Sequence, residues 1–171
     1  IGGAGGIGVS AAAKYFLCRG ARVSGSDLSL SEVSRLLSKR GAQIFEGHRA
    51  ENLPADTELV IYSPAVPAHN PERARARAQG ISEWNYHEFL AALSKVKRTI
   101  AISGTHGKST TTAMTAKILE VAGLDPLVIV GSLVPGFADG NFRDGGGEWF
   151  VVEACEYRRH MLLLKPEIAA V

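Results

Sequence analysis

The chain has 171 residues, a length that suits one or two domains, with 46% hydrophobic and 21% charged residues. Its formal net charge of only +2 gives no reason to expect a nucleic acid or an anionic membrane surface as a partner. No apolar run reaches the roughly 18 residues that a transmembrane helix needs. The two cysteines, Cys18 and Cys155, are too few for a disulfide framework and lack metal-ligand spacing, so we expect a soluble protein of a reducing cytoplasm.

The chain opens on a glycine cluster, in which Gly3, Gly5 and Gly8 have the spacing Gly-x-Gly-x-x-Gly. Apolar residues at helical spacing follow, and then a predicted strand over 21–27 that ends in Asp27. Glycine loop, helix, strand and acid in this order are typical of a dinucleotide-binding fold, with a diphosphate at the helix N-terminus and the acid near a ribose. The alternative is that the glycines only allow the helix and strand to pack closely.

The next part of the chain keeps alternating helices and strands, which is typical of a parallel sheet covered on both faces. The spacing of Ser29 and Glu32 predicts a capping box for a helix that stops at Gly41. Asn70 and Pro71 predict another helix start, and we expect the alternating arginines that follow to form a solvated face. The other elements expected here are strands over 42–45, 58–63 and 81–85 and a helix over 86–93.

A polar, basic segment at 94–98 separates this region from a new strand, so we expect two domains, 1–97 and 98–171. The first is expected to be Rossmann-like, and the second to be the start of a P-loop-type domain with a parallel sheet. The chain begins without Met beside its glycine loop and ends in a strand. We therefore expect a piece of a longer protein.

The strand over 99–102 runs into a predicted phosphate-binding loop. Gly104 and Gly107 let backbone N–H groups approach an anion, and Lys108 supplies a point charge for the β- and γ-phosphates. The hydroxyl of the following serine or threonine suits Mg²⁺. Strict Walker spacing requires glycine where Ile102 stands, so the loop is a variant, and an ordinary strand-to-helix turn is the alternative. The predicted loop residues are Gly104, Thr105, His106, Gly107, Lys108, Ser109 and Thr110.

A buried-type strand over 149–152 delivers Glu153 at its carboxyl end. Ligands of open parallel sheets bind at that edge, where the phosphate loop also opens, so Glu153 is the candidate second ligand of Mg²⁺. A plain carboxylate at a strand end is the alternative. Glu156 and Arg159 are expected in the same cleft, and the patternless glycine-rich segment 131–147 is expected to be a long mobile loop.

Taken together, these motifs resemble the Mur ligases, in one collinear order along essentially the whole chain. The family's usual Glu-Ala-Asp-Glu-Ser-Asp is here Glu-Ala-Cys-Glu-Tyr-Arg, so Cys155 and Arg158 replace two acids. The motifs that carry the resemblance are the glycine cluster, Ser-Gly-Ser-Asp at 24–27, Glu-Gly-His at 46–48, Ser-Pro-Ala at 63–65, Asn-Pro-Glu at 70–72, the phosphate loop and Glu-Ala-Cys-Glu at 153–156.

The resemblance implies an ATP-dependent ligase of peptidoglycan precursor synthesis, and it implies that this chain does not turn over alone, because the family's carboxy-terminal domain is expected beyond Val171. It implies that the muramoyl carboxylate of UDP-N-acetylmuramate receives the γ-phosphoryl group, and that the amine of L-alanine attacks the acyl phosphate. Lys108 and Glu153 are then the catalytic candidates, with ATP at 104–110 and Mg²⁺ between Ser109 and Glu153. The residues implied for the UDP group are Gly5, Gly6, Ile7 and Gly8 for the diphosphate and Asp27, His48 and Ser63 for the uridine.

Three alternatives stay open. A related ligase that recycles murein tripeptide shares His106 in the loop, and the residues that choose the acceptor are expected beyond this chain. An NAD-dependent oxidoreductase explains the first glycine cluster and Asp27 but leaves the second loop without a purpose. A non-catalytic nucleotide-binding module is the third. Nothing in the sequence indicates an oligomeric state.

Overall fold

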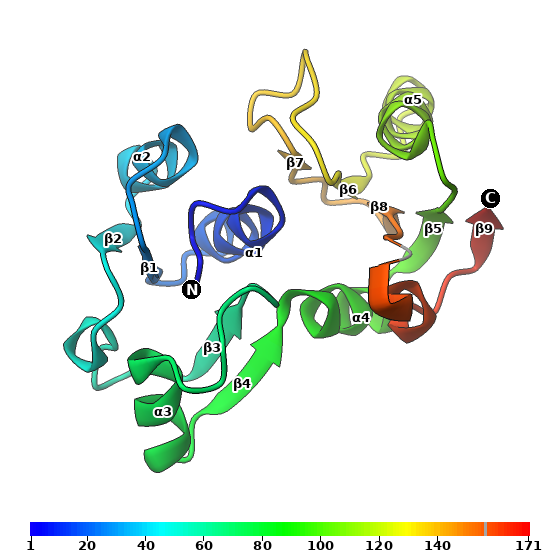
Figure 1. Ribbon diagram of the computed structural model, residues 1–171. Helices are drawn as coiled ribbons and strands as arrows, with labels where there is room; N and C mark the ends of the chain where they lie inside the picture. The colour runs from blue at the N-terminus through cyan, green and yellow to red at the C-terminus, as the bar shows by residue number, and fades with distance from the viewer. Residues whose placement is uncertain (156) are drawn as a thin grey trace. The chain divides into compact units, whose positions relative to one another are not determined.

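The computed structural model describes residues 1–155 and 157–171, and the chain forms an α/β structure with two compact units, 1–86 and 87–171 (Figure 1). All of helix α4 (Tyr86–Val96) except Tyr86 belongs to the second unit, whereas the expected boundary at 97/98 assigns this helix to the first. The backbone N–H of Lys165 donates to Ser94 Oγ on this helix at 3.0 Å. Among the described residues, no helix has the length and apolar character to cross a membrane.

The first unit contains a parallel sheet assembled around the first residues of the chain. Strand β1 (Ser24–Asp27) pairs with β2 (Gln43–Glu46), and β3 (Leu59–Tyr62) pairs with β4 (Ser82–Asn85). Gly2 bridges both Ser26 and Tyr62 in parallel and so joins the two pairs. With this segment counted as the first strand, the order is the 3-2-1-4-5 of dinucleotide-binding folds. The point where the order reverses, which is where such folds bind ligands, lies between Gly2 and β3.

The helices of the first unit begin and end largely where local chemistry predicts. Helix α1 (Ile7–Cys18) follows the glycine loop, and the chain turns away at Gly20, whose φ is +75°. Helix α3 (Pro71–Ala78) is capped by Asn70, whose Oδ1 accepts hydrogen bonds from two backbone N–H groups of the first turn. Both helix starts were predicted from these residues.

The capping box of α2 (Glu32–Lys39) differs from the prediction. The cap is Ser31, not Ser29, because the Ser31 hydroxyl accepts from the backbone N–H of Ser34 and the Ser34 hydroxyl accepts from that of Ser31. A serine three residues after the cap thus replaces the acid that the usual pattern contains. A 3-10 turn, η1 (Ala50–Asn52), which no sequence pattern indicated, follows β2.

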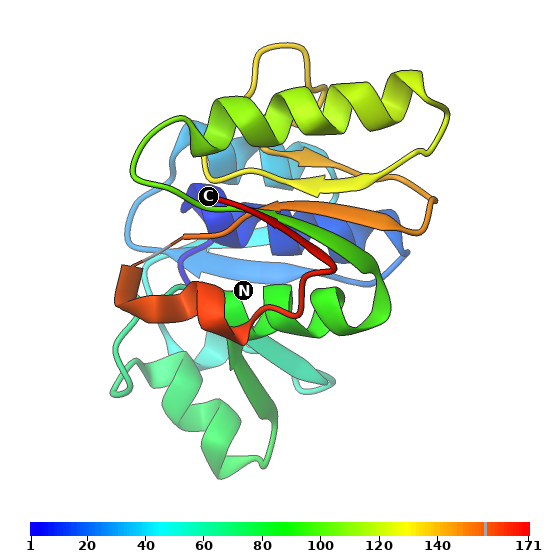
Figure 2. The same cartoon turned by 90° about the vertical axis from the view of Figure 1, so that its right-hand side faces the viewer.

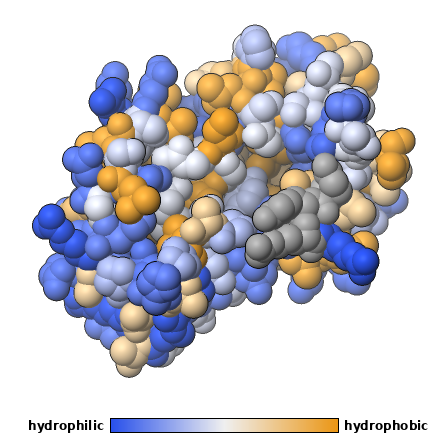
Figure 3. Space-filling model, viewed as in Figure 1, coloured by the Kyte–Doolittle hydropathy of each residue, from blue (hydrophilic) through white to orange (hydrophobic). Residues whose placement is uncertain are grey.

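The arginines of α3 are only partly solvated. Arg73 lies with its guanidinium 3.5 Å from the centre of the Tyr62 ring and 2.8 Å from Glu83 Oε1, and 11% of its side chain is exposed. Arg77 reaches the other oxygen of Glu83 at 3.0 Å. The expectation of a solvated face is therefore wrong for Arg73, although the surface over α3 is mostly hydrophilic in Figure 3.

The second unit is a five-stranded sheet in the order β7-β6-β8-β5-β9, parallel except for the edge strand β7. Helix α5 (Lys108–Val121) covers one face, and α4 with the 3-10 turn η2 (Tyr157–Leu163) covers the other (Figures 1 and 2). Ala116 of α5 packs on Val128, Val130 and Val151 to form the core on its side. The strands are β5 (Arg98–Ile102), β6 (Leu127–Ile129), β7 (Phe142–Arg143), β8 (Trp149–Glu153) and β9 (Ile168–Ala170).

The glycine-rich segment 131–147 is more ordered than its sequence pattern suggests. Strand β7 lies within it, and Asn141 and Phe142 are buried. At its end, Asp125 accepts hydrogen bonds from the backbone N–H of Gly146 at 2.7 Å and from Arg143 at 2.8 Å. The hydrogen bond from Gly146, and after it the one from Arg143, lower the pKa of the Asp125 carboxyl. The expectation of one long patternless loop is therefore wrong at this end of the segment.

Gly145 lies so close to the backbone of Asp125 and Pro126, just before β6, that a side chain has no room. A Cβ there would stand 2.1 Å from the carbonyl oxygen of Pro126 and 2.3 Å from that of Asp125. We expect Gly145→Ala to lower the free energy of unfolding by about 3 kcal/mol, measured by urea denaturation. Gly146→Ala is the matched control, because its Cβ would meet only Asp125 Oδ2, at 3.4 Å. Equal losses in the two variants would contradict this packing.

Candidate functional site

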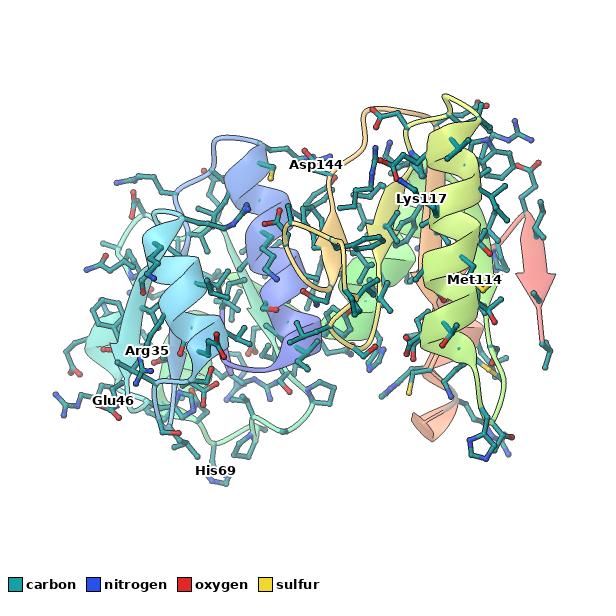
Figure 4. All side chains as sticks on the ribbon, turned by 90° about the horizontal axis from the view of Figure 1, so that it is seen from above. Arg35, Glu46, His69, Met114, Lys117 and Asp144 are labelled. Carbon is teal, nitrogen blue, oxygen red and sulfur yellow. The ribbon has the colours of Figure 1, made fainter. Side chains whose placement is uncertain are left out.

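A cavity of about 600 Å³ lies in the first unit, at the point where the strand order reverses. Its size suits a nucleotide-sized ligand, since small-molecule pockets run from about 300 to 1,000 Å³. His69, which also lines it, projects outward from the loop before α3 in Figure 4. The structure brings together in this lining Gly5, Gly6, Asp27, His48 and Ser63 from the predicted UDP set.

Asp27 holds the glycine loop in place. The backbone N–H of Gly5 donates to its Oδ2 at 2.7 Å, and that of Leu28 donates to its Oδ1 at 2.7 Å. A Cβ on Gly5 would stand 2.8 Å from the same Oδ2, so glycine is required for this approach. Because a carboxylate has further lone pairs, Asp27 can fix the loop and also accept a hydrogen bond from a ligand hydroxyl.

Ile7 and Gly8, the other two predicted diphosphate residues, do not line the cavity. A Cβ on Gly8 would lie 2.9 Å from Cε1 of Tyr86, so this glycine allows the helix to pack on that ring. The packing alternative therefore describes the Gly8 side of the helix. Both residues belong to the first turn of α1, where the helix itself has no carbonyl to accept from the backbone N–H groups. A role of these two residues in diphosphate binding therefore depends on their backbone alone.

His48 is connected to two residues for which the sequence assigned no role. Its Nδ1 lies 2.8 Å from Ser26 Oγ, and that hydroxyl donates to Glu72 Oε2 at 2.6 Å. Glu72 was noted only as part of the Asn-Pro-Glu motif, and Ser26 as part of Ser-Gly-Ser-Asp. Because the three residues come from three separate segments, no local pattern could show that they meet.

The second predicted loop lies between β5 and α5 in the second unit. Gly107 has φ +76° and caps α5, while Gly104 has φ +134°, so both need the freedom of glycine. Lys108 Nζ donates to the carbonyl oxygen of Gly104 at 2.6 Å, which holds the ammonium over the loop. The side chains of Thr105, His106 and Thr110 are exposed. The loop thus presents backbone amides and one positioned cation, as an anion site requires.

Glu153 lies beside this loop because β5 and β8 are parallel neighbours, with Ile102 and Glu153 in register. Ser109 Oγ donates to Glu153 Oε2 at 2.8 Å, and the backbone N–H of Gly131 donates to the same oxygen at 2.9 Å. A Cβ on Gly131 would stand 3.0 Å from the carboxylate. A hydroxyl and a carboxylate side by side at a phosphate loop match the oxygen donors that Mg²⁺ takes. The sequence analysis predicted Ser109 and Glu153 for this place but not Gly131, which contacts the same carboxylate.

A much smaller cavity is lined by Glu153, two histidines and Cys155. The rings of His87 and His160 stack with centroids 3.8 Å apart. Burial, and then the neighbouring His160, lower the pKa of His87 to about 4, so this ring is neutral at pH 7. Arg159 is exposed and does not line the cavity, and Glu156 lies outside the described residues. In the described part of the chain, no three His, Cys, Asp or Glu residues converge as a metal site.

Comparison with known proteins places these features in a family. Residues 2–98 match the model described as Mur ligase family, catalytic domain. The UDP-N-acetylmuramate–L-alanine ligase of Dinoroseobacter shibae is 48% identical over 90% of this chain and 33% of its own length. That of Desulforapulum autotrophicum is 46% identical over 99% of this chain and 37% of its own. The chain thus spans about a third of the length of these curated relatives.

Solved structures give the same result. The UDP-N-acetylmuramate–alanine ligase of Thermotoga maritima superposes with a TM-score of 0.90 at 35% identity, over 98% of this chain and 39% of that one. A murein peptide ligase from Psychrobacter arcticus superposes with a TM-score of 0.82 at 26% identity, over 98% of this chain and 41% of that one. Since the family model matches more than half of the chain, this protein belongs to the Mur ligase family.

Proposed function

We propose that this chain provides the UDP-sugar site and the phosphate-binding part of the ATP site of a ligase that joins L-alanine to UDP-N-acetylmuramate in peptidoglycan precursor synthesis. The observation that carries the proposal is the phosphate loop beside Glu153, with Ser109 Oγ 2.8 Å from the carboxylate. An oxidoreductase has no use for this second anion site. A nucleotide-binding module without activity would use the same lysine and carboxylate to bind Mg²⁺ and a nucleotide, so ATP-dependent ligation by the full-length protein is the measurement that separates the two.

Each group has a separate task in this proposal. Glu153 and Ser109 hold Mg²⁺, which neutralises phosphate charge when it is bound with ATP. Lys108, held by the Gly104 carbonyl, stabilises the charge that develops as the γ-phosphoryl group moves to the muramoyl carboxylate. The resulting acyl phosphate is attacked by the amine of L-alanine, and phosphate leaves as the amide forms. The backbone amides of the loop orient the phosphates throughout.

The relatives support L-alanine as the acceptor rather than a murein peptide. The curated relatives named as alanine ligases are 41–48% identical to this chain, whereas the solved murein peptide ligase from Psychrobacter arcticus is 26% identical. In the full-length protein, we expect faster ATP-dependent ligation with L-alanine than with the murein tripeptide.

We propose the cytoplasm as the location of this protein, because both nucleotide substrates, ATP and UDP-N-acetylmuramate, are available there.

The first unit is expected to bind UDP-N-acetylmuramate more tightly than NAD. The cavity that contains Asp27, His48 and Ser63 is the basis for this expectation, because these polar groups surround a space of nucleoside size. Isothermal titration calorimetry of the chain with each ligand makes the comparison. Tighter binding of NAD would replace the ligase assignment by the oxidoreductase alternative.

A further inference from the structure

We propose that Ser26 and Glu72 are positioning residues that keep the hydrogen of the neutral His48 ring on Nδ1, so that Nε2 offers a lone pair to the uridine of the bound UDP group. The proposal rests on the UDP-binding function proposed above for this cavity. A lone pair on Nε2 accepts a hydrogen bond from the imide N–H of uracil or from a ribose hydroxyl, and it repels a phosphate oxygen. The contact is therefore specific for the uridine part of the ligand.

Glu72 is fixed as an acceptor by donors on both of its oxygens. Only 8% of the residue is exposed. Oε1 accepts from Asn52 Nδ2 at 2.9 Å and from the backbone N–H of Arg49 at 3.4 Å. Oε2 accepts from Ser26 Oγ at 2.6 Å. Glu72 also lies in the first turn of α3, where the helix dipole favours a negative charge.

The hydrogens that Ser26, Glu72 and His48 share in their hydrogen bonds can be counted. A serine hydroxyl has one hydrogen, and Ser26 donates it to the carboxylate of Glu72. The 2.8 Å contact between Ser26 Oγ and His48 Nδ1 must then use a hydrogen on Nδ1. A neutral imidazole has only one N–H, so Nε2 has none. In metal sites, the hydrogen-bond partner of the ring nitrogen that does not bind the metal fixes the histidine tautomer in the same way.

The position of His48 makes this tautomer relevant to the ligand. His48 lines the cavity together with Asp27 and Ser63, and only 14% of its side chain is exposed. Since Nδ1 is committed to Ser26, Nε2 is the ring nitrogen that remains for a ligand. A ligand that presents a donor at this point is bound, and one that presents an acceptor leaves two lone pairs facing each other. The hydrogen-bonded relay formed by Glu72, Ser26 and His48 therefore favours a ligand that presents the hydrogen-bond donors of a nucleoside.

Glu72→Gln is expected to reverse the tautomer. The amide must turn its oxygen toward the two donors Asn52 and Arg49, which leaves its NH₂ facing Ser26. The Ser26 hydroxyl then accepts from Gln and donates to Nδ1, and the ring hydrogen moves to Nε2. Nitrogen-15 NMR of the histidine rings of the 171-residue chain, at about pH 8.5, where imidazole is neutral, distinguishes the two nitrogens. The spectrum of His48→Asn assigns the signals.

Glu83→Gln is the matched control. Glu83 is a similarly shielded carboxylate of the same unit, with 12% of its side chain exposed, and its hydrogen bonds go to Arg73 and Arg77 rather than to Ser26 or His48. We expect hydrogen on Nδ1 in the wild type and in Glu83→Gln, and on Nε2 in Glu72→Gln. UDP should bind about tenfold more weakly to Glu72→Gln and within about twofold of wild type to Glu83→Gln, measured by calorimetry.

A wild-type ring with hydrogen on Nε2, or an unchanged tautomer in Glu72→Gln, would overturn the proposal. If Glu72→Gln does not fold, Ser26→Ala replaces it. This variant removes the acceptor of the Nδ1 hydrogen, and Glu72 Oε2, at 3.8 Å from Nδ1, is too far away to replace it, so the preference for that tautomer should be lost. The tautomer is read without a ligand, so the relay is judged by NMR alone. Failure of the wild-type chain to bind UDP would instead overturn the proposed function.

Discussion

Replacing Lys108 by alanine in the full-length protein is expected to slow acyl phosphate formation about 100- to 1,000-fold. The ammonium is held 2.6 Å from the Gly104 carbonyl, in the loop that we propose binds the phosphates, and its loss removes a preorganised charge from that step. Binding of UDP-N-acetylmuramate should stay nearly unchanged, because the two loops belong to separate units. Trapping of the acyl phosphate with hydroxylamine measures the first effect, and calorimetry the second.

Lys117→Ala is the matched control for this variant. Lys117 belongs to the same helix, α5, but is labelled well along it in Figure 4, pairs with Glu120 at 3.0 Å and has 66% of its side chain exposed. An exposed pair of this kind contributes little, so the control should act like the wild type. Wild-type turnover by Lys108→Ala would show that 104–110 is not the ATP loop.

Replacing Glu153 by glutamine is expected to raise the Mg²⁺ concentration for half-maximal ligation by at least about tenfold. The amide keeps the shape, and its oxygen can still accept from Ser109 and the Gly131 N–H. The negative charge is lost, however, and a hard cation prefers a carboxylate oxygen. Excess Mg²⁺ should therefore partly restore the rate. A Mg²⁺ titration of ATP-dependent ligation in the full-length protein gives both quantities.

Cys155→Asp is the control next to this ligand. It restores the acid that the family resemblance implies at this position, and we expect ligation near the wild-type rate. Cys155 is only half-buried, and the stacked His87, whose pKa is lowered to about 4, is neutral at pH 7 and attracts no thiolate. An inactive Cys155→Asp beside an unaffected Glu153→Gln would exchange the roles assigned to these two residues.

Features determined within a few residues could be predicted from the sequence. Asn70 with Pro71, Gly20, and the phosphate loop before Lys108 are each decided by the conformational limits of a short segment. The α/β fold follows from the alternation of such segments. The location of Glu153 was predictable for a related reason: parallel strands place their carboxyl ends at one edge, so the end of β8 had to face the loop after β5.

What depends on contacts between distant segments could not be predicted. The contact of Ser26 with Glu72 joins residues 46 positions apart, and that of Gly131 with Glu153 joins residues 22 apart. Neither has a local signature. Ser31 was missed as a cap because a serine replaces the usual acid three residues later. Strand β7 was missed because two residues within a glycine-rich segment give no detectable alternation.

The central claim is that the two loops serve one reaction through an acyl phosphate. It is tested most directly by ligation of L-alanine by the full-length protein with UDP-N-acetylmuramate whose carboxylate carries oxygen-18. The phosphoryl group bonds to a carboxylate oxygen, and this oxygen leaves with phosphate when the amine attacks. We predict inorganic phosphate that contains one labelled oxygen per amide formed. Unlabelled phosphate, or release of AMP and pyrophosphate, would contradict the account.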